Sequence, residues 1–329
     1  MLRIYLYARC QSGRAGPQQI ARLDNTIVML APQITPIPLD QNAEALRLVC
    51  SHLPADLRTD QVAMLLADIR AKQGPPRLLL GAYREERLTG AVLARVQPGR
   101  SAVVWTPRLL AGEPAATAKE LLKMTVGWLA GESIRIAQID LHCDPVADAA
   151  ILHAGGFEPL ADLLYLVSHQ SYFPDSPPSP ELEFEQYSED NQGLLTRLVE
   201  ATYVQSLDCP QLDGIRRIED VLAGYRHTGV FDPARWLIVR YNGKEIGCLI
   251  LAEHPEHDNW ELVYMGVVAN ARGHGWGLSI TRHAQWLTRQ AGRSRLVLAV
   301  DAANEPGIRM YAAAGFRTWD RRTVYLKVF

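Results

Sequence analysis

Cysteine is scarce in this sequence, and its distribution argues against the sites that cysteine usually builds. The five cysteines of the 329-residue chain are scattered, odd in number and without CxxC spacing; they are Cys10, Cys50, Cys143, Cys209 and Cys248. This pattern favours a reduced, cytoplasmic protein without a disulfide framework or a zinc site. The nine histidines form no H-x-x-x-H pair, so we predict no bound metal.

Long apolar runs and an excess of charge of one sign are also missing. The chain begins with a brief apolar patch that Arg3 and Arg9 interrupt, and no run approaches the roughly 20 apolar residues of a membrane-spanning helix. Lys and Arg total 34 against 36 Asp and Glu, which gives a net charge of −2. We therefore expect a soluble protein that binds neither nucleic acid nor a membrane.

The length and composition of the chain suit two domains. A chain of 329 residues exceeds one ordinary compact domain, and 48% apolar residues can bury two cores. The stretch around residues 171–182 is rich in proline and serine and has no periodicity, which is typical of a linker. We predict one domain at 1–170, the linker at 171–182 and a second domain at 183–329.

Hydrophobic periodicity predicts the same order of elements in both domains. The first is expected to contain, in order, a strand at 34–39, helices at 42–53 and 59–72, strands at 77–82, 88–96 and 101–110, a helix at 118–129, a strand at 134–141, a helix at 146–154 and a strand at 163–167. The second is expected to repeat this order at 182–186, 191–203, 215–224, 236–241, 245–252, 260–268, 278–291, 296–300, 305–314 and 323–328. A further strand at 2–8 has no assigned role.

Residues 262–277 combine a buried strand, a glycine-rich turn and the start of a helix. The turn reads Arg272-Gly273-His274-Gly275-Trp276-Gly277. The first turn of a helix leaves backbone N–H groups unpaired and favours anions, and glycine lets phosphate oxygens approach those amides. The spacing fits neither a Walker loop nor a G-x-G-x-x-G fingerprint. The alternatives are a turn that only needs positive φ angles, and an Arg272 that is only a solvated charge.

The pattern Arg272-x-x-Gly275-x-Gly277 after a strand resembles the acyl-CoA pyrophosphate loop of the GNAT N-acetyltransferase superfamily. Val300-x-x-x-Asn304, followed by Tyr311 and Gly315-Phe316, resembles the next strand and helix of that family and keeps every interval. The resemblance implies an α/β (mixed α+β) protein of two tandem GNAT-like domains. Each would have a mixed, mostly antiparallel central sheet flanked by helices.

The first domain has the repeated order of elements without the residues of the loop. The Gly-Phe pairs of the two copies differ by 316 − 157 = 159 positions. At this offset Arg272 corresponds to Glu113, Gly275 to Ala116, Gly277 to Ala118, Asn304 to Pro145 and Tyr311 to Leu152. An acidic side chain in place of a cation repels phosphate. We therefore predict that the first copy lacks an acyl-CoA site, a layout that resembles the mycothiol synthases.

The resemblance also implies roles for individual residues. Tyr311 would protonate the departing thiolate, and Glu261 would be the base that neutralises the acceptor amine, with Glu253, His254 and His257 as further candidates. The acetyl-CoA-binding residues would be Met265, Gly266, Val267, Arg272, Gly273, His274, Gly275, Trp276, Gly277, Leu278 and Asn304. The sequence leaves open whether Asn304 is a helix N-cap, whether Tyr311 is only a packing residue and whether Glu261 is a surface side chain.

These interpretations together predict an N-acetyltransferase that moves an acetyl group from acetyl-CoA to a primary amine directly, in a ternary complex. No cysteine lies on the motif, which argues against a covalent acyl-enzyme. The acidic residues Asp208, Asp213, Glu219 and Asp220 favour a cationic amine, whether a small molecule or a peptide. A non-catalytic sensor of acyl-CoA is the alternative. The sequence leaves open whether the protein is a monomer or a homodimer.

Overall fold

The computed structural model describes residues 31–71, 74–142 and 146–329, so the strand expected at 2–8 lies outside the described residues. The N-terminal half contains β1 (Gln33–Pro36), α1 (Asn42–Val49), α2 (Ala55–Arg70), β2 (Arg77–Arg84), β3 (Arg87–Gln97), β4 (Ser101–Val104), β5 (Arg108–Leu109), α3 (Ala115–Gly131), β6 (Ile136–His142), α4 (Val146–Ala154) and β7 (Glu158–His169). The C-terminal half contains β8 (Leu182–Gln186), α5 (Gln192–Tyr203), α6 (Ile218–Arg226), β9 (Trp236–Tyr241), β10 (Lys244–His254), β11 (Asn259–Val267), α7 (Trp276–Gln290), β12 (Arg295–Asp301), α8 (Glu305–Ala313) and β13 (Arg317–Val328). Both halves are mixed α/β, as predicted.

Most predicted elements differ from the observed ones by a few residues at one or both ends, and three of these differences have identifiable reasons. The strand expected at 101–110 is split into β4 and β5, because Pro107 lies between them and has no N–H to donate to a neighbouring strand. The helix expected at 42–53 ends at Val49, ahead of a turn in which the Ser51 N–H donates to Leu48. The last strand begins at Arg317 instead of 323, since it is paired along its whole length.

The internal repeat is exact over the last three elements of each half. Strand β6, helix α4 and strand β7 begin 159 positions before β12, α8 and β13, as 295 − 136, 305 − 146 and 317 − 158 all give 159. The offset taken from the two Gly-Phe pairs therefore also relates the secondary structure. The two halves share one order of strands and helices.

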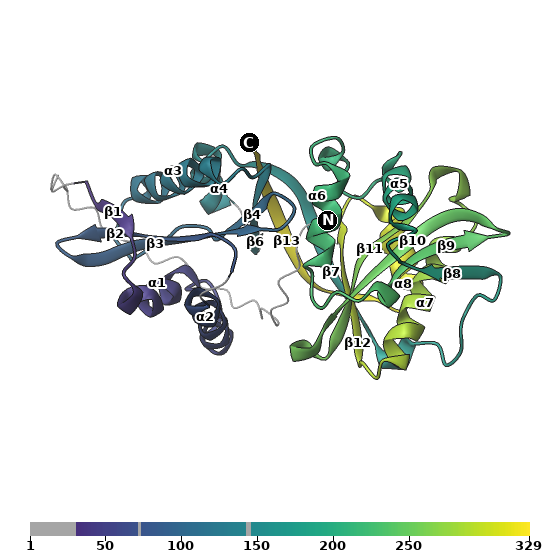
Figure 1. Cartoon of the computed structure of the whole chain (residues 1–329). Coiled ribbons are helices and arrows are strands. Elements are labelled where there is room, and N and C mark those ends of the chain that lie inside the picture. Colours follow the sequence, from purple (N-terminus) through teal and green to yellow (C-terminus); the bar gives the residue numbers. More distant parts are fainter. Residues whose placement is uncertain (1–30, 72–73, 143–145) are drawn as a thin grey trace.

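One continuous sheet joins the halves (Figure 1). Its strand order is β1-β2-β3-β4-β6-β13-β7-β12-β11-β10-β9-β8, with β5 paired to β3. The last strand of each half, β7 or β13, thus pairs with the penultimate strand of the other half, β12 or β6. We refer to β7 and β13 as the exchanged strands. The linker at 171–182 stays a prediction. The strands that precede it and the strands that follow it belong to the same sheet.

The exchanged strands also pair with each other, antiparallel, at the centre of the sheet. Arg317 lies opposite Val167, and Leu326 lies opposite Glu158. Adding 159 to 158 and 167 gives 317 and 326. Each residue of one exchanged strand therefore faces the same partner position as its counterpart in the other strand does. Such self-complementary pairing is the arrangement found at a two-fold interface between identical subunits.

Each half of the sheet is covered by helices on both faces. In the N-terminal half, α1 and α2 bury Leu46 and its neighbours on one face, and α3 and α4 bury Leu121 and Leu152 on the other. In the C-terminal half, α5 and α6 bury one core around Leu195, and α7 and α8 bury another around Ile280. A fifth cluster lies on the exchanged strands and includes residues from the segment between α5 and α6.

We predict that the two halves unfold as one unit, because each contains a strand of the other. Replacing the fully buried Leu121 of α3 by Ala should cost about 2–5 kcal/mol of unfolding free energy. The midpoint of a single urea transition should fall, and hydrogen exchange should rise in β9 and β10 of the other half as well. Met124→Ala, on the exposed side of the same helix, is the matched control and should change little. A two-step transition, with β9 and β10 unaffected, would contradict this expectation.

Candidate active site

The parallel strands β11 and β12 separate after a short paired stretch. They pair only from Asn259 to Glu261, opposite Arg295 to Val297. Beyond this point β11 continues to Val267 against β10, and β12 continues to Asp301 against β7. The backbone of β11 from Leu262 onward therefore has no partner in β12, and a polar edge opens inside the sheet. Such an edge can pair with an extended ligand.

The loop between β11 and α7 is held in place by Arg272. Its guanidinium donates to the carbonyl oxygens of Val267 at 2.9 Å, Gln205 at 2.9 Å and Thr202 at 2.8 Å. These bonds connect the loop to the end of β11 and to the end of α5. The planar fork of arginine suits such a contact, and lysine could not reproduce it. In this structure Arg272 is directed at the polypeptide, so its contact with phosphate stays a prediction.

Two of the three glycines in the loop have the left-handed backbone that glycine favours. Gly273 and Gly275 have φ angles of 83° and 81°, and a Cβ at either position would meet no atom within 4 Å. Gly275 caps α7, whose first-turn amides at Trp276 and Gly277 have no acceptor within the helix. Gly277 needs no such φ angle. The same loop can therefore be both a turn that requires positive φ angles and a binding site for an anion.

The other side chains of this loop differ in how far they are exposed to solvent. His274 is exposed, with its Nδ1 2.9 Å from the Arg272 carbonyl oxygen. Trp276 and Leu278 are half-buried and pack against the core under α7, where the Trp276 ring is 4.6 Å from that of Tyr241. We infer that the backbone of this loop, more than its side chains, faces the open space.

Strand β11 is in unusually close contact with α5 at Gly266. A Cβ at this glycine would lie 2.5 Å from the Thr202 Oγ1 atom. Thr202 is itself fixed, because its hydroxyl lies 2.6 Å from the Tyr264 hydroxyl and donates to the Val199 carbonyl oxygen. The side chains of Met265 and Val267 pack against the core on the α7 side. The absence of a side chain at 266 is therefore a packing requirement.

Asn304 and Tyr311 belong to α8, which follows β12. The Oδ1 atom of Asn304 accepts a hydrogen bond from the Gly307 N–H at 3.1 Å, so Asn304 is the N-cap that the sequence left as one alternative. Tyr311 is 7% exposed and packs edge-on against Phe316, 5.6 Å away. Burial, and then the charge of Asp208, raise the pKa of the Tyr311 phenol far above its usual value. The phenol therefore stays protonated at any ordinary pH.

A cavity of about 470 Å³ lies beneath the segment between α5 and α6. Its wall carries the carboxylates of Glu200, Asp208 and Asp213, several tyrosines and one cation, Arg216. Burial raises the pKa of the Asp208 carboxyl, and the Asp301 N–H donates to it at 2.9 Å. Leu163 of the exchanged strand β7 also lines this cavity, so the N-terminal half contributes to its wall.

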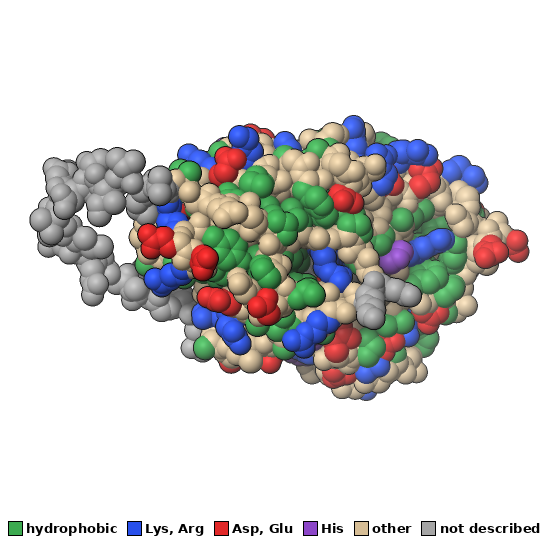
Figure 2. Space-filling view, turned by 60° about the vertical axis from the view of Figure 1, so that its left-hand side comes forward, with side chains coloured by type: hydrophobic (Ala, Val, Ile, Leu, Met, Phe, Trp, Pro, Cys, Tyr) green, Lys and Arg blue, Asp and Glu red, His purple; other side chains and the backbone are tan. Residues whose placement is uncertain are grey.

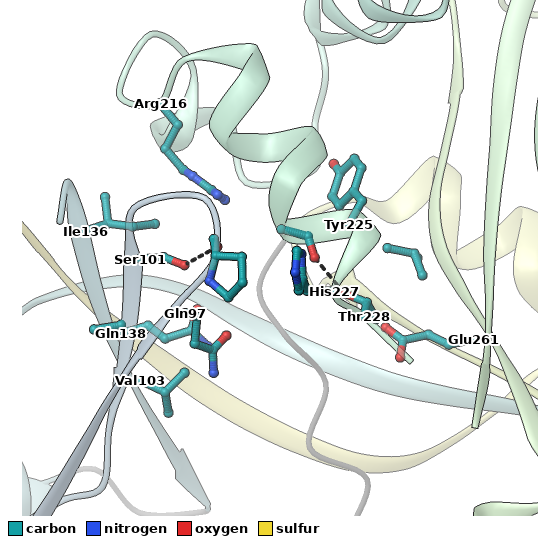
Figure 3. A pocket seen from close by; sticks show the side chains of 14 residues that line it. Gln97, Ser101, Val103, Ile136, Gln138, Arg216, Tyr225, His227, Thr228 and Glu261 are labelled. Carbon is teal, nitrogen blue, oxygen red and sulfur yellow. Dashed lines mark hydrogen bonds between the residues drawn. The ribbon is translucent and has the colours of Figure 1, made fainter. Parts of the chain in front are cut away.

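A smaller pocket of about 30 Å³, room for about one water molecule, lies between the halves. Figure 3 shows Gln97 and Gln138 of the N-terminal half on one side of it and Glu261 of β11 on the other. Glu261 is 1% exposed, so it is not a surface side chain. Arg216 and Tyr225 line both this pocket and the larger cavity, which places the two spaces side by side.

The two predicted catalytic residues lie on opposite faces of the sheet. Trp260 and Leu262 of β11 belong to the core under α7 and α8, which also contains Tyr311. Because side chains alternate along a strand, Glu261 points to the other face, toward α6 and the N-terminal half. The gap where β11 leaves β12 opens the sheet near both residues. Neither of the two cavities has Tyr311 in its wall.

The loop of the N-terminal half that corresponds to the glycine-rich turn is closed by an ion pair. The Glu113 carboxylate accepts two hydrogen bonds from Arg84, of which the shortest is 2.8 Å, and another from the Thr117 hydroxyl. The Arg84 contact lowers the pKa of the Glu113 carboxyl. Only 3% of its side chain is exposed. A carboxylate thus occupies the place where Arg272 stands in the other half.

Sequence reasoning missed how the segment between α5 and α6 is fixed. The Asp301 carboxylate accepts from the Cys209 N–H at 3.2 Å and from the Ala303 N–H at 2.8 Å, while Asp208 accepts from the Asp301 N–H. The two carboxylates thereby connect this segment to the end of β12. Asp208 and Asp301 are 93 positions apart, and no local pattern indicates such a contact. In the sequence, Asp208 stands out only as one of several neighbouring acidic residues.

The face of the molecule drawn in Figure 2 shows no dominant charge. On the face drawn in Figure 2, Lys and Arg side chains alternate with Asp and Glu side chains. Across residues 31–71, 74–142 and 146–329, no helix is long and apolar enough to cross a membrane. The same residues contain no group of three His, Cys, Asp or Glu side chains that could hold a metal ion.

Comparison with known proteins places the glycine-rich loop inside a known family. Residues 199–316 match the profile of the acetyltransferase (GNAT) family. A mycothiol acetyltransferase of Pseudarthrobacter chlorophenolicus is 31% identical over 109 residues, which are 32% of this chain and 34% of the relative. A mycothiol acetyltransferase of Paenarthrobacter aurescens is 26% identical over 193 residues, 56% of this chain and 58% of the relative. The matches thus span about a third to somewhat over half of these relatives' length.

Solved structures share the tandem fold. A GCN5-related N-acetyltransferase from Sphaerobacter thermophilus superposes with a TM-score of 0.62 at 15% identity, over 90% of this chain and 95% of its own. A tandem GNAT protein from the clavulanic acid biosynthesis pathway superposes with a TM-score of 0.51 at 15% identity, over 90% and 98%. At such identities the likeness concerns the fold alone.

We predict that Gly266→Ala destabilises the protein by about 1–3 kcal/mol, because the new methyl group overlaps Thr202 and must displace α5 from β11. The measurement is the urea midpoint at constant m-value. Gly193→Ala is the control, since its Cβ would meet only Arg197 at 3.6 Å and lie within α5. An unchanged midpoint for Gly266→Ala would show that α5 does not press on the strand.

Proposed function

Since residues 199–316 match the acetyltransferase (GNAT) family, we propose that the protein transfers an acetyl group from acetyl-CoA to a primary amine in a ternary complex. The observation that carries this proposal is the coincidence of three features in one place. These are the gap between β11 and β12, the glycine-rich loop at the start of α7, and the acidic cavity beside them. The C-terminal half would hold the site.

The residues present fit acetyl-CoA. The open edge of β11 at Met265, Gly266 and Val267 offers backbone partners for an extended pantetheine chain. The first-turn amides of α7 and the free space at Gly273 and Gly275 suit a pyrophosphate. When bound, acetyl-CoA supplies an activated acetyl group as a thioester. Arg272 would act by fixing this loop, and Asn304 by capping α8 at the end of the gap.

The acceptor amine would enter through the cavity beneath the segment between α5 and α6. Glu200, Asp208 and Asp213 give its wall a negative balance against the single cation Arg216, which suits an ammonium group. A volume of about 470 Å³ accommodates a small molecule or the end of a peptide. Because the relatives named above are mycothiol acetyltransferases, mycothiol without its acetyl group is the first acceptor to test.

Glu261 and Tyr311 would handle the two protons of the reaction. An ammonium group cannot attack a thioester until it loses a proton, and Glu261 would accept that proton through a water molecule in the small pocket. Tyr311 would donate its phenolic proton to the departing sulfur. Its raised pKa keeps that proton available across the working range of pH. The unpaired amides of β11 would polarise the reacting carbonyl group.

A sensor that binds acyl-CoA without turnover is the competing proposal. It needs the same loop and gap, but no base, no acid and no acceptor cavity. The buried carboxylate of Glu261 and the cavity beside it are costly features for a protein that only binds. They favour the enzyme.

We expect one equivalent of acetyl-CoA to bind in calorimetric titration and Gly275→Glu to abolish it. The new side chain adds negative charge and fills the space before α7. Gly292→Glu is a matched control, because Gly292 also has a positive φ angle, 69°, and no atom within 4 Å of a Cβ. Ala116→Glu tests the corresponding loop of the N-terminal half and should leave binding intact. Saturation at 100 times Kd should stabilise the fold by about 2.7 kcal/mol.

Binding that survives Gly275→Glu, or no binding by the wild type, would mean that the loop is only a turn. One-equivalent binding with both controls intact would justify an amine screen. The panel would contain mycothiol without its acetyl group, glucosamine, spermidine and a short peptide with a free N-terminus. Formation of CoA would be followed by chromatography, because a thiol reagent would also react with the thiol of the first acceptor.

Tyr311→Phe should lower kcat by about 100-fold and leave the KM for acetyl-CoA unchanged, because the ring keeps its packing against Phe316 and only the proton donor is lost. Since burial raises the pKa of this phenol, wild-type activity should show no loss from Tyr311 ionisation as the pH rises to about 10. The measurement is the pH profile of kcat for both proteins. Full activity of Tyr311→Phe would assign the tyrosine to packing.

A further inference from the structure

Glu261 is a buried carboxylate that would have to remain ionised between turnovers. Its side chain is 2% exposed, and an isolated carboxylate in such a place tends to become protonated or to move. Under the proposed function Glu261 is the base, and the inference below depends on that role. An ionised buried carboxylate needs a hydrogen-bond donor, and the structure provides one.

His254 is that donor. Its Nε2 atom lies 2.8 Å from the Oε2 atom of Glu261. In the β10–β11 ladder Ala252 lies opposite Glu261 and His254 lies opposite Asn259, so His254 is a diagonal neighbour on the same face of the sheet. The His254 side chain is 12% exposed. It therefore stands between the buried carboxylate and the solvent.

The surrounding charged groups are occupied elsewhere. Glu253, the preceding residue, forms ion pairs with Arg235 at 2.6 Å and with Arg293. The His257 ring lies 6.5 Å from the His254 ring, and Arg295 donates to the His257 carbonyl oxygen. From the two ends of α6, Arg216 before the helix and His227 after it line the small pocket beside Glu261. Among these groups, Glu261 is the carboxylate in hydrogen-bonding contact with His254.

We propose that His254 is a positioning residue for Glu261: the neutral imidazole donates its Nε2–H to Oε2, which fixes the carboxylate and leaves Oε1 to take the acceptor's proton. The bond that breaks is N–H of the ammonium group, and the bond that forms is O–H at Oε1 by way of the pocket water. Protonation of His254 turns the contact into an ion pair and weakens Glu261 as a base. The pair thus couples activity to pH.

The direction of this coupling follows from the charge of the pair. A proton on the His254 imidazole places a positive charge beside the Glu261 carboxylate, which makes that carboxylate a weaker base. Activity should therefore fall on the acid side, and a side chain at 254 that gains no charge should lessen this loss.

Two substitutions separate positioning from packing. His254→Leu leaves the buried carboxylate without a donor, and kcat should fall by about 100-fold with acetyl-CoA and the most active amine of the panel above. His254→Gln keeps an N–H donor and should retain kcat at pH 8 within about threefold. Its acid limb should lie at lower pH than that of the wild type, since glutamine gains no charge beside Glu261. His257→Gln is the matched control and should leave the limb unchanged.

A measurement without acceptor tests the same contact. With ¹⁵N-labelled histidine, His254 should appear as the Nε2–H form at neutral pH, and its Nε2 signal should shift in Glu261→Gln because the acceptor of that hydrogen bond has changed. An Nδ1–H form, or the same Nε2 signal in both proteins, would overturn the proposal. An acid limb that stays in place in His254→Gln would also overturn it.

The failure of the proposed function gives a different result. If the wild type transfers no acetyl group to any amine, the enzyme proposal fails. The ¹⁵N measurement still shows whether His254 donates a hydrogen bond to Glu261. If Glu261→Gln is fully active, both the base and its positioning residue are wrong. If Glu261→Gln is inactive and His254→Gln keeps the wild-type pH profile, the positioning role alone is wrong.

Discussion

The antiparallel pairing of β7 with β13 is the contact on which the remaining architecture depends. It joins two half-sheets into one, and each of its strands completes the half to which it does not belong. Strand β12 is held by β7 on one side, which fixes the edge from which β11 departs. The same contact brings Gln97 and Gln138 of the N-terminal half to face Glu261. The candidate site therefore exists in this form because the strands are exchanged.

Sequence patterns predicted the local parts of this arrangement well. The order of elements, the offset of 159 and the glycine-rich loop all rest on intervals of a few residues or on direct comparison of the two copies. The strand exchange could not be predicted in this way. A strand with the composition of β13 has the same apolar pattern whether it lies beside β12 or beside β6, because its register with either neighbour is set by contacts far away in sequence.

The same limit applies to the side chains of the site. The sequence predicts a phosphate contact for Arg272, which stays a prediction, whereas its three acceptors in the structure are Val267 of β11, Thr202 of α5 and Gln205 just beyond α5, up to 70 positions away. Sequence alone suggested a phosphate ligand, since a cation beside glycines is common in anion sites. Gly266 was assigned to ligand binding, whereas its contact with Thr202 gives an independent reason for glycine. A glycine at this position can serve both ligand binding and packing. The structure shows the packing requirement alone.

The two halves show how one scaffold accommodates opposite charges at the same position. In the C-terminal half a cation at 272 binds carbonyl oxygens and leaves helix amides free for an anion. In the N-terminal half the carboxylate at 113 is paired with Arg84 and accepts a hydrogen bond from Thr117, and a carboxylate at this position disfavours phosphate. What that half keeps is its sheet and the side chains at its inner edge. Under the proposed function this half would still help to determine which acceptor fits, because Gln97 and Gln138 line the pocket that also contains Glu261.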